Sequence, residues 1–447
     1  MSNEPSLRLE LEQSTPARND EKSPGTNDLA LAEHFVAEQG ADLRYCNQWA
    51  CWLVWDGRRW ALNRTELTWR ALQATDAIGL PRTRPTERLA AGAIRLARCA
   101  PSVRVEPEAL NSNPHLFNCA NGTLDLLLGE LREHRREDLI TRLSPVVWDP
   151  DATAPRWEAF IAEITGGDVE LAAFLQRVVG YVISGRMDEQ ALFYVLGPAA
   201  SGKSTFVRVL LDVLGDYGSS GAFDQMPWSQ NVVHKVDPAK LLGLRAFAVG
   251  DFEPTRSISS HTIARATDCT PISVLRPDLW NYVPTQKILL ASSLPARFTG
   301  DEGSVARRLH TVRLVAVPDA SRDRGLVDKL CAERAGILRW AALGFTRWQQ
   351  HGLRPPPGVL RGTSRRPEIE TSAEPSEFVK ACCEFEPGAS TLAADLVHAY
   401  RVWCASRGVA APGWRVFAPR LRALGLRPAR ASKGVRWWRG VRLKSEA

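Results

Sequence analysis

The chain has 447 residues, of which 44% are hydrophobic, and a formal net charge of +7. This length predicts two to four globular domains. No apolar stretch is long enough to span a membrane, and the N-terminus lacks the pattern of a signal peptide, so we expect a cytoplasmic protein with no membrane partner. The nine cysteines form no C-x-x-C pair, which argues against a zinc site and for reduced, mostly buried thiols.

The first part of the chain predicts a tail and then a mixed domain. Residues 1–27 are rich in Ser, Pro, Asn and Glu without periodicity, which predicts disorder. Residues 28–185 predict an α+β domain. Its signals are a helix that ends at Gly40, hairpin turns at Asp56-Gly57 and Asn121-Gly122, and two helices broken at Gly166-Gly167.

The second part predicts a parallel α/β domain, a linker and a small basic domain. In residues 186–354, the segments ALFYVL, RAFAVG and KILLAS are expected strands with helices between them. Residues 355–375 have the Pro, Gly and Ser content of a linker. Residues 376–447 predict three helices followed by a hairpin, which is a winged-helix plan. The helices are SEFVKACCEF, AADLVHAYRVWCASRG and WRVFAPRLRALG, and the hairpin is SKGVRWWRGVRLK.

A phosphate-binding loop stands between the first of these strands and a helix. Gly197, Gly202, Lys203 and Ser204 fit the pattern G-x-x-x-x-G-K-S/T. In such a loop the backbone amides cradle phosphate oxygens, the lysine reaches the β- and γ-phosphates, and the hydroxyl holds Mg²⁺. We therefore expect ATP and Mg²⁺ as cofactors; the alternative is an ordinary glycine turn. The predicted nucleotide-binding residues are Gly197, Pro198, Ala199, Ala200, Ser201, Gly202, Lys203, Ser204 and Thr205.

ATP hydrolysis also needs acidic, polar and cationic groups near the γ-phosphate. Asp251 and Glu253 follow the strand RAFAVG, so Asp251 is expected to hold Mg²⁺ together with Ser204, and Glu253 to orient the attacking water. The alternative is a pair of exposed loop acids. Ser293 follows the strand KILLAS, where a polar side chain could sense the γ-phosphate. The adjacent Arg307 and Arg308 are candidates for supplying transition-state charge to a neighbouring subunit's ATP.

The basic residues of the chain are concentrated at its C-terminus. From residue 411 to residue 447, ten Lys and Arg residues are opposed only by Glu446. This segment also contains Trp437 and Trp438, and the combination predicts a polyanionic partner, most simply DNA. The alternatives are a solvated surface or a winged helix that docks protein. The predicted DNA-contacting residues here are Arg415, Arg420 and Arg422 on the third helix and Lys433 and Arg436 on the wing.

Together these motifs resemble the superfamily 3 helicases, and within them the phage and plasmid primase-helicases related to the poxvirus primase-helicase. The resemblance extends from about Asp28 to Arg442. It is carried by NGTLDLLLGEL, the P and W of APRWEAF, GPAASGKSTF, RAFAVGDFEP, TPISVLRPDLW, ILLASSLP, DEGSVARR and the C-terminal EF, AYRVWC and RGVRL pattern.

The resemblance implies an AAA+-like P-loop core between a collar-type domain and a winged helix. It implies a ring, expected to be a hexamer, that uses ATP to move 3′ to 5′ on single-stranded or forked DNA. Lys203, Ser204, Asp251 and Glu253 would serve one subunit's nucleotide. Arg308 is preferred over Arg307 as the residue that reaches it from the neighbour, and Arg276 would lie at a DNA-gripping hairpin.

Two positions depart from the family pattern. Ser293 stands where relatives usually have Asn, and Asp251 stands where they commonly have Glu. No primase domain precedes Asp28, so no primase activity is expected and priming would need a separate primase or replisome protein. Two other functions remain open. One is an initiator that uses ATP only to assemble on DNA, which the short Ser293 side chain would favour. The other is a P-loop kinase for a small molecule, which would leave the basic C-terminus unexplained.

Overall fold

The computed structural model describes residues 26–77, 87–223, 241–250, 257–268, 271–273, 281–318, 323–361, 375–406, 417–418, 421–422, 424, 426–430 and 436–444. The chain divides into two compact units, residues 1–363 and residues 364–447. Each unit has its own hydrophobic core. No helix in the described part of the chain is both long and apolar enough to cross a membrane.

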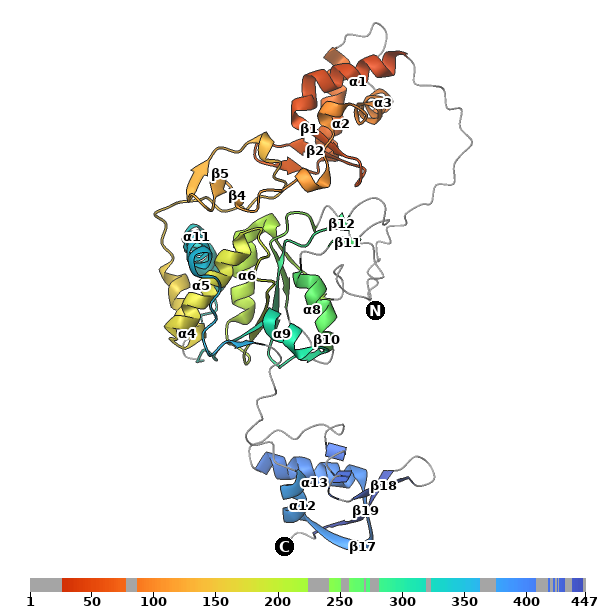
Figure 1. Ribbon diagram of the computed structural model, residues 1–447, viewed down its shortest axis with the longest axis vertical. Helices are drawn as coiled ribbons and strands as arrows, with labels where there is room; N and C mark the ends of the chain where they lie inside the picture. Colours follow the sequence, from red (N-terminus) through yellow and green to blue (C-terminus); the bar gives the residue numbers. More distant parts are fainter. Residues whose placement is uncertain are drawn as a thin grey trace, which may run out of the picture. The chain divides into compact units, whose positions relative to one another are not determined.

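The larger unit begins with three helices and a small antiparallel sheet (Figure 1). The elements are α1 (Thr26–Gln39), β1 (Leu43–Cys46), β2 (Cys51–Trp55), β3 (Trp60–Ala61), α2 (Arg64–Ala77) and α3 (Glu87–Ala97). Phe35, Val54 and Ala90 share the core of this part. The predicted turn between β2 and β3 is confirmed. The Asp56 carboxylate accepts hydrogen bonds from the amides of Arg58 and Arg59 at 2.9 Å, which stabilises it.

A second antiparallel sheet and several short turns follow. The strands are β4 (Leu116–Cys119), β5 (Gly122–Asp125) and β6 (Glu130–Arg132). The hairpin expected at Asn121-Gly122 is present, but its turn residues are Ala120 and Asn121, because Gly122 already pairs with Cys119. The short 3-10 helices of the unit are Gly40–Asp42, Pro101–Val103, Pro107–Ala109, Arg136–Asp138 and Gly215–Tyr217. Two further small sheets pair β10 (Ser257–Ser259) with β14 (Arg297–Thr299) and β11 (Ile272–Ser273) with β12 (Asn281–Tyr282).

A six-stranded sheet forms the centre of the unit. In spatial order its strands are β16 (Leu360–Arg361), β15 (Leu309–Arg313), β7 (Leu192–Leu196), β13 (Lys287–Ser292), β9 (Ala246–Val249) and β8 (Gly218–Ser220). Every neighbouring pair is parallel except β15 with β16, so five strands run in one direction. The three strands expected from the sequence are confirmed as β7, β9 and β13. The sheet is the parallel layer of a mixed α/β fold.

Helices cover both faces of this sheet. Phe193 and Val195 of β7 pack with α4 (Pro155–Thr165), α5 (Val169–Ile183), α6 (Lys203–Leu214), α10 (Leu326–Ala332) and α11 (Arg334–His351). The alternate residues Tyr194 and Leu196 belong to the core on the other face, with α8 (Ser260–Thr267) and α9 (Glu302–Arg308). Because successive side chains of a strand point to opposite faces, a strand buried on both faces reads as a continuous apolar run.

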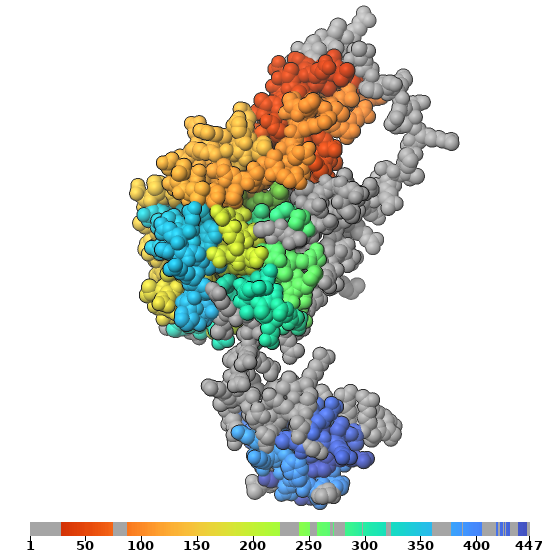
Figure 2. Space-filling model, in the orientation of Figure 1, coloured from red at the N-terminus to blue at the C-terminus, as the bar shows by residue number. Residues whose placement is uncertain are grey.

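The helices α4 and α5 are part of this layer. A Cβ atom on Gly180 of α5 would lie 2.0 Å from the Phe345 amide nitrogen of α11, so only glycine permits the close approach of the two helices. Figure 2 shows the light blue surface of α11 beside the yellow surface of α4 to α6. The predicted domain boundary at residue 185 therefore lies inside a single hydrophobic core that joins α4 and α5 to the sheet.

In the smaller unit, the described residues form the helices α12 and α13 and a three-stranded sheet. Its elements are α12 (Pro375–Cys382), β17 (Cys383–Leu392), α13 (Ala393–Ser406), β18 (Arg427–Arg430) and β19 (Arg436–Leu443). The expected helix at 376–385 is wrong in its last three residues, because β17 begins at Cys383 and pairs with β19 from that residue on. Of the expected third helix, residues 417–418 and 421–422 are described, and they are helical.

Candidate functional site

The phosphate-loop motif has the strand, loop and helix geometry that the sequence predicts. The loop follows β7 at the carboxyl edge of the sheet, and α6 begins at Lys203. Gly202 is the N-terminal cap of α6 and has a positive φ of 78°, which glycine adopts without steric cost. Pro198, Ala199 and Ala200 are exposed, and so is Ser204, whereas Ser201 is buried. Free backbone amides at a helix N-terminus attract anions, which fits the phosphates of ATP.

The Lys203 amine is folded into the loop. Its Nζ donates hydrogen bonds to the carbonyl oxygens of Gly197 at 2.7 Å and Pro198 at 2.6 Å, and to Ser201 Oγ at 3.1 Å. The residue is only 8% exposed. A buried ammonium needs hydrogen-bond acceptors, and here the acceptors are neutral. The loop therefore holds a positively charged amine against its own backbone, where it could exchange these acceptors for the oxygen atoms of an anionic ligand.

The wall of the loop comes from segments that the sequence motif does not contain. The amide of Val317 donates to the Ala200 carbonyl at 3.1 Å, and the amide of Val315 donates to the Ile164 carbonyl of α4 at 3.0 Å. A Cβ atom on Gly202 would lie 2.6 Å from Cγ2 of Ile164 and 2.9 Å from the Phe160 ring. Thus α4 and the chain that follows β15 position the loop, although no sequence signal marked Phe160 or Ile164.

The next strand of the sheet brings Ser293 to the same edge. Ser292 is in register with Leu196, and its carbonyl accepts a hydrogen bond from the Gly197 amide at 3.3 Å. Ser293, the residue after Ser292, therefore lies level with the start of the phosphate loop, and it is exposed. Tyr194 holds this turn, since its hydroxyl donates to the Leu294 carbonyl at 2.5 Å. Burial raises the pKa of Tyr194, so the phenol stays protonated and keeps this hydrogen bond.

The expected acidic residues Asp251 and Glu253 lie outside the described residues. The strand that leads to them, β9, ends at Val249, and Val249 is in register with Leu290 of β13. The described part of β9 therefore ends at the carboxyl edge of the sheet, on the same side as the phosphate loop. The role of Asp251 as a ligand of Mg²⁺ therefore stays a prediction.

The two adjacent arginines have different surroundings. Arg308 Nη2 lies 3.0 Å from Asp268 Oδ1, and Arg308 Nη1 donates to Ser304 Oγ at 2.9 Å. The Arg308 side chain is 12% exposed. Arg307 is exposed and has no ion pair among the described residues. Arg308 thus ties α9 to the residue that follows α8, whereas Arg307 remains available to another molecule.

Both arginines stand at the opposite edge of the sheet from the phosphate loop. Leu309 of β15 is in register with Leu192 of β7, and the two strands run parallel. Arg307 lies on α9 just before Leu309, while Gly197 follows the end of β7, and at roughly 3.3 Å per residue Leu309 and Gly197 are about 17 Å apart along the strand direction. A side chain at this position cannot reach the loop of its own chain.

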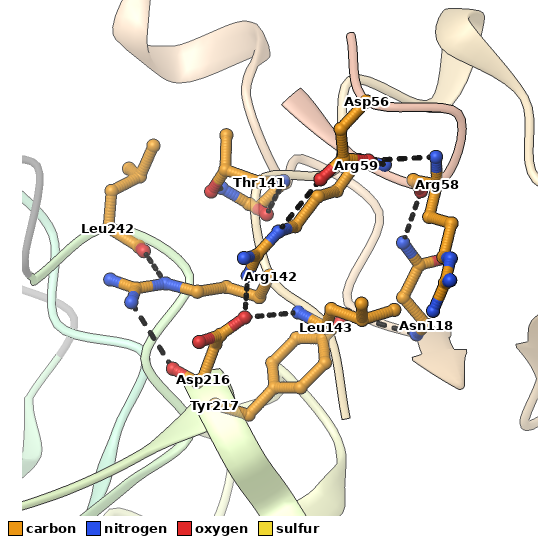
Figure 3. Close-up of polar contacts among 11 residues, drawn as sticks. Asp56, Arg58, Arg59, Asn118, Thr141, Arg142, Leu143, Asp216, Tyr217 and Leu242 are labelled. Carbon is orange, nitrogen blue, oxygen red and sulfur yellow. Dashed lines mark hydrogen bonds and ion pairs between the residues drawn. The ribbon is translucent and has the colours of Figure 1, made fainter. Parts of the chain in front are cut away.

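The C-terminal end of α6 is joined to the first part of the unit by a polar cluster (Figure 3). The carboxylate of Asp216, two residues after α6, forms an ion pair with Arg59 and accepts the Leu143 amide at 3.1 Å. Arg142 donates to the carbonyl oxygens of Asp216 at 3.2 Å and Leu242 at 2.8 Å. The helix that starts at the phosphate loop is therefore anchored, at its other end, to the hairpin of β2 and β3.

Part of the basic surface expected in the smaller unit lies among the described residues. Arg422 is exposed, and Arg436 begins β19, whereas Arg276 of the larger unit and Arg415, Arg420 and Lys433 lie outside the described residues. The structure adds a pair that the sequence reasoning missed. Arg427 and Arg439 are both exposed and face each other across β18 and β19. Like charges in directly opposite positions repel, so this pair favours an anionic partner.

The two tryptophans of this segment have different roles. Trp438 is 1% exposed and lies in the core of the smaller unit, so its ring is not accessible to a polyanionic partner. Trp437 is partly exposed. Successive residues of a strand point to opposite faces, which explains why only one of the two faces solvent.

In the described part of the chain, the cysteines and the other potential metal-ligating side chains form no metal-binding site. Cys46, Cys119, Cys383 and Cys404 are buried and unoxidised, and burial raises the pKa of the Cys46 thiol to about 11. No group of three or more His, Cys, Asp or Glu side chains in the described residues has the arrangement of a metal site.

Comparison with known proteins relates the first part of the chain to a family. Residues 31–166 match the family model described as D5 N terminal like, which supports a relation to the phage primase-helicases. Solved structures of the NrS-1 C-terminal region are also similar. One A-form apo structure has a TM-score of 0.44 at 10% identity and covers 70% of this chain and 68% of that chain. An apo structure of its residues 305–718 has a TM-score of 0.45 at 8% identity, covering 93% and 100%. At this level the structural likeness gives no information about activity.

Proposed function

We propose that the chain is an ATP-dependent DNA helicase that works in DNA replication. The observation that carries the proposal is the loop between β7 and α6, where a buried Lys203 and the free amides of a helix N-terminus meet at the carboxyl edge of a parallel sheet. The relation of residues 31–166 to the phage primase-helicases supports the role in replication.

The residues of the loop fit ATP and Mg²⁺. The Lys203 amine would exchange its neutral carbonyl acceptors for phosphate oxygens, which are stronger acceptors for a cation. The exposed Ser204 hydroxyl would be a metal ligand, with Asp251 as its expected partner and Glu253 as the residue that orients water. Bound Mg²⁺-ATP supplies a phosphoanhydride bond whose hydrolysis releases free energy, and the metal ion neutralises charge on the phosphates.

Arg307 is the residue that we propose acts on a neighbouring subunit's nucleotide. The sequence reasoning preferred Arg308, but Arg308 is engaged with Asp268, whereas Arg307 is exposed. Since Arg307 precedes a strand whose first residue, Leu309, is about 17 Å from the loop along the strand direction, a catalytic role requires a second copy of the chain. This favours a ring, for which a hexamer that moves 3′ to 5′ on single-stranded DNA is the expected form.

The smaller unit is proposed to be a winged helix that binds DNA. Its helix, strand, helix, strand, strand order and the exposed Arg422, Arg427 and Arg439 support this assignment. Arginines on a hairpin contact phosphates without reading sequence, so this unit would help to load the ring. A winged helix that docks another protein, such as a separate primase, is the alternative.

A second candidate function is an ATP-dependent assembly factor with little unwinding activity. Ser293 favours it, because the short hydroxymethyl side chain at the edge of β13 has less reach than the Asn expected from the family pattern. Ser292 does not replace it, since its hydroxyl donates to the Leu294 carbonyl at 3.0 Å.

The test is ATP hydrolysis by the purified chain with and without single-stranded DNA, using Lys203→Ala as the blank. DNA-stimulated turnover that this substitution abolishes supports the helicase and leads to an assay of forked-duplex unwinding. Binding of ATP without turnover in either condition supports the assembly factor. Mixing Lys203→Ala chains with Arg307→Ala chains tests action between subunits. If Arg307 acts on a neighbour, some mixed interfaces combine an intact loop with an intact arginine, so the mixture regains activity that each variant alone lacks.

A further inference from the structure

A second candidate binding site lies in the first part of the larger unit, away from the phosphate loop. A groove of about 860 Å³ opens between the strands β1 and β2, the start of α2 and the last turns of α3. The lining residues with chemistry to offer are Tyr45, Trp49, Trp52, Arg64, Arg95 and Arg98. None of the described residues that line the groove is an Asp or a Glu. The groove therefore combines aromatic rings with uncompensated positive charge.

The aromatic side of the groove is held in place by strand pairing. Tyr45 of β1 and Trp52 of β2 are in register, and their ring centroids are 5.0 Å apart with an interplanar angle of 53°. Tyr45 is buried, whereas Trp52 and Trp49 are partly exposed. Such a cross-strand pair fixes the orientation of the outer ring at little entropic cost when a ligand binds. Trp52 thus presents a preorganised apolar surface to the groove.

The cationic side comes from two helices. Arg95 lies in the last turn of α3, Arg98 follows the end of this helix at Ala97, and Arg64 is the first residue of α2. All three are exposed, and none forms an ion pair with a residue in the described part of the chain. Three arginines around one groove without a carboxylate repel one another, so an anionic ligand lowers the electrostatic energy of the site.

We infer that this groove binds a single strand of DNA, with the arginines on phosphates and the Trp52 ring against a base. Aromatic rings and a basic groove are the two elements of general single-strand binding, because every unpaired base offers a ring face. A duplex keeps its base faces stacked inside, so it cannot use the rings. The inference goes beyond the proposed ATPase and takes from the proposed function only the choice of DNA over RNA.

The test compares single charge reversals in the full chain without nucleotide. Arg95→Glu is expected to weaken binding of a fluorescent oligo-dT about tenfold, by loss of a phosphate contact and repulsion. The matched control is Arg135→Glu, because Arg135 is also exposed and unpaired in the described part of the chain but does not line the groove. It should change the affinity less than twofold. The basic C-terminal segment is present in both variants and contributes equally. Equal loss in the two variants overturns the inference.

Two further measurements locate the contact. Arg95→Ala should reduce the slope of log affinity against log salt concentration by about 0.7, the value for one phosphate contact on a single strand. An oligonucleotide with 5-bromodeoxyuridine should crosslink under ultraviolet light to the peptide that holds Trp49 and Trp52, and the crosslink should decrease in Trp52→Leu. An unchanged slope, or crosslinks confined to other peptides, contradicts the inference.

The last measurements compare different nucleic acids as ligands and separate a failure of the groove from a failure of the proposed ATPase. Tighter binding of a duplex, or of oligo-rU as strongly as oligo-dT, overturns the assignment to single-stranded DNA. Thermal denaturation of each variant checks that the fold is intact. If ATP turnover is absent in every protein while Arg95→Glu still binds oligo-dT more weakly than Arg135→Glu, the proposed ATPase fails and the groove does not. If turnover is normal but Arg95→Glu binds like Arg135→Glu, only the groove fails.

Discussion

The contact between the phosphate loop and α4 leads to a quantitative prediction for Gly202→Ala. Gly202 has a φ of 78°, and a left-handed conformation costs a residue with a Cβ atom about 1 kcal/mol. The new Cβ would also lie 2.6 Å from Cγ2 of Ile164 and 2.9 Å from the Phe160 ring. Overpacking of this kind costs about 1–3 kcal/mol. We therefore expect Gly202→Ala to lower the free energy of unfolding by about 2–4 kcal/mol.

The matched control separates the two contributions. Gly129 has a φ of 72°, but a Cβ atom added there would have no other atom within 4 Å, so Gly129→Ala should lose only the conformational part, about 1 kcal/mol. The free energy of unfolding is measured by urea titration with tryptophan fluorescence. In a background of Ile164→Ala, the additional effect of Gly202→Ala should fall toward the control value. Equal losses for Gly202→Ala and Gly129→Ala would refute the claim that α4 presses on the loop.

Three other substitutions test ion pairs of the larger unit. Arg308→Ala should lower the free energy of unfolding by about 1 kcal/mol in thermal denaturation, because Asp268 loses its cation. Asp216→Asn should speed amide hydrogen exchange at the β2 and β3 hairpin, because the ion pair that ties this hairpin to the end of α6 is lost; unchanged exchange would argue against the anchor. The Arg334 guanidinium, by hydrogen bonding, holds the pKa of Asp212 below its ordinary value of 3.8. Asp212→Asn should therefore lower the free energy of unfolding at pH 7. This difference from the unaltered chain should disappear as the pH falls below 3.8, because Asp212 then becomes protonated.

Local sequence determined much of the site and of the elements around it. The positions of β7, the loop and α6 could be predicted because they depend on an apolar run, two glycines and helical periodicity within one short segment. The hairpins at Asp56-Gly57 and near Asn121 were predictable for the same reason, although the second turn lies one residue earlier than expected. The end of the helix before Cys383 could not be predicted. Cys383 pairs in a sheet with Leu443, which is 60 residues away in the sequence.

The tertiary structure decided the surroundings of the candidate residues. The family pattern favoured Arg308 over Arg307, but folding brought Asp268 to Arg308 and left Arg307 exposed. The same holds for Ile164 and Phe160 against the loop, and for the rings and arginines of the groove, which come from four separate elements. Local patterns specify what a segment can form because backbone hydrogen bonds and side-chain periodicity are short-ranged. Packing between distant segments sets burial, charge pairing and access to ligands, and these quantities exist only in the folded chain.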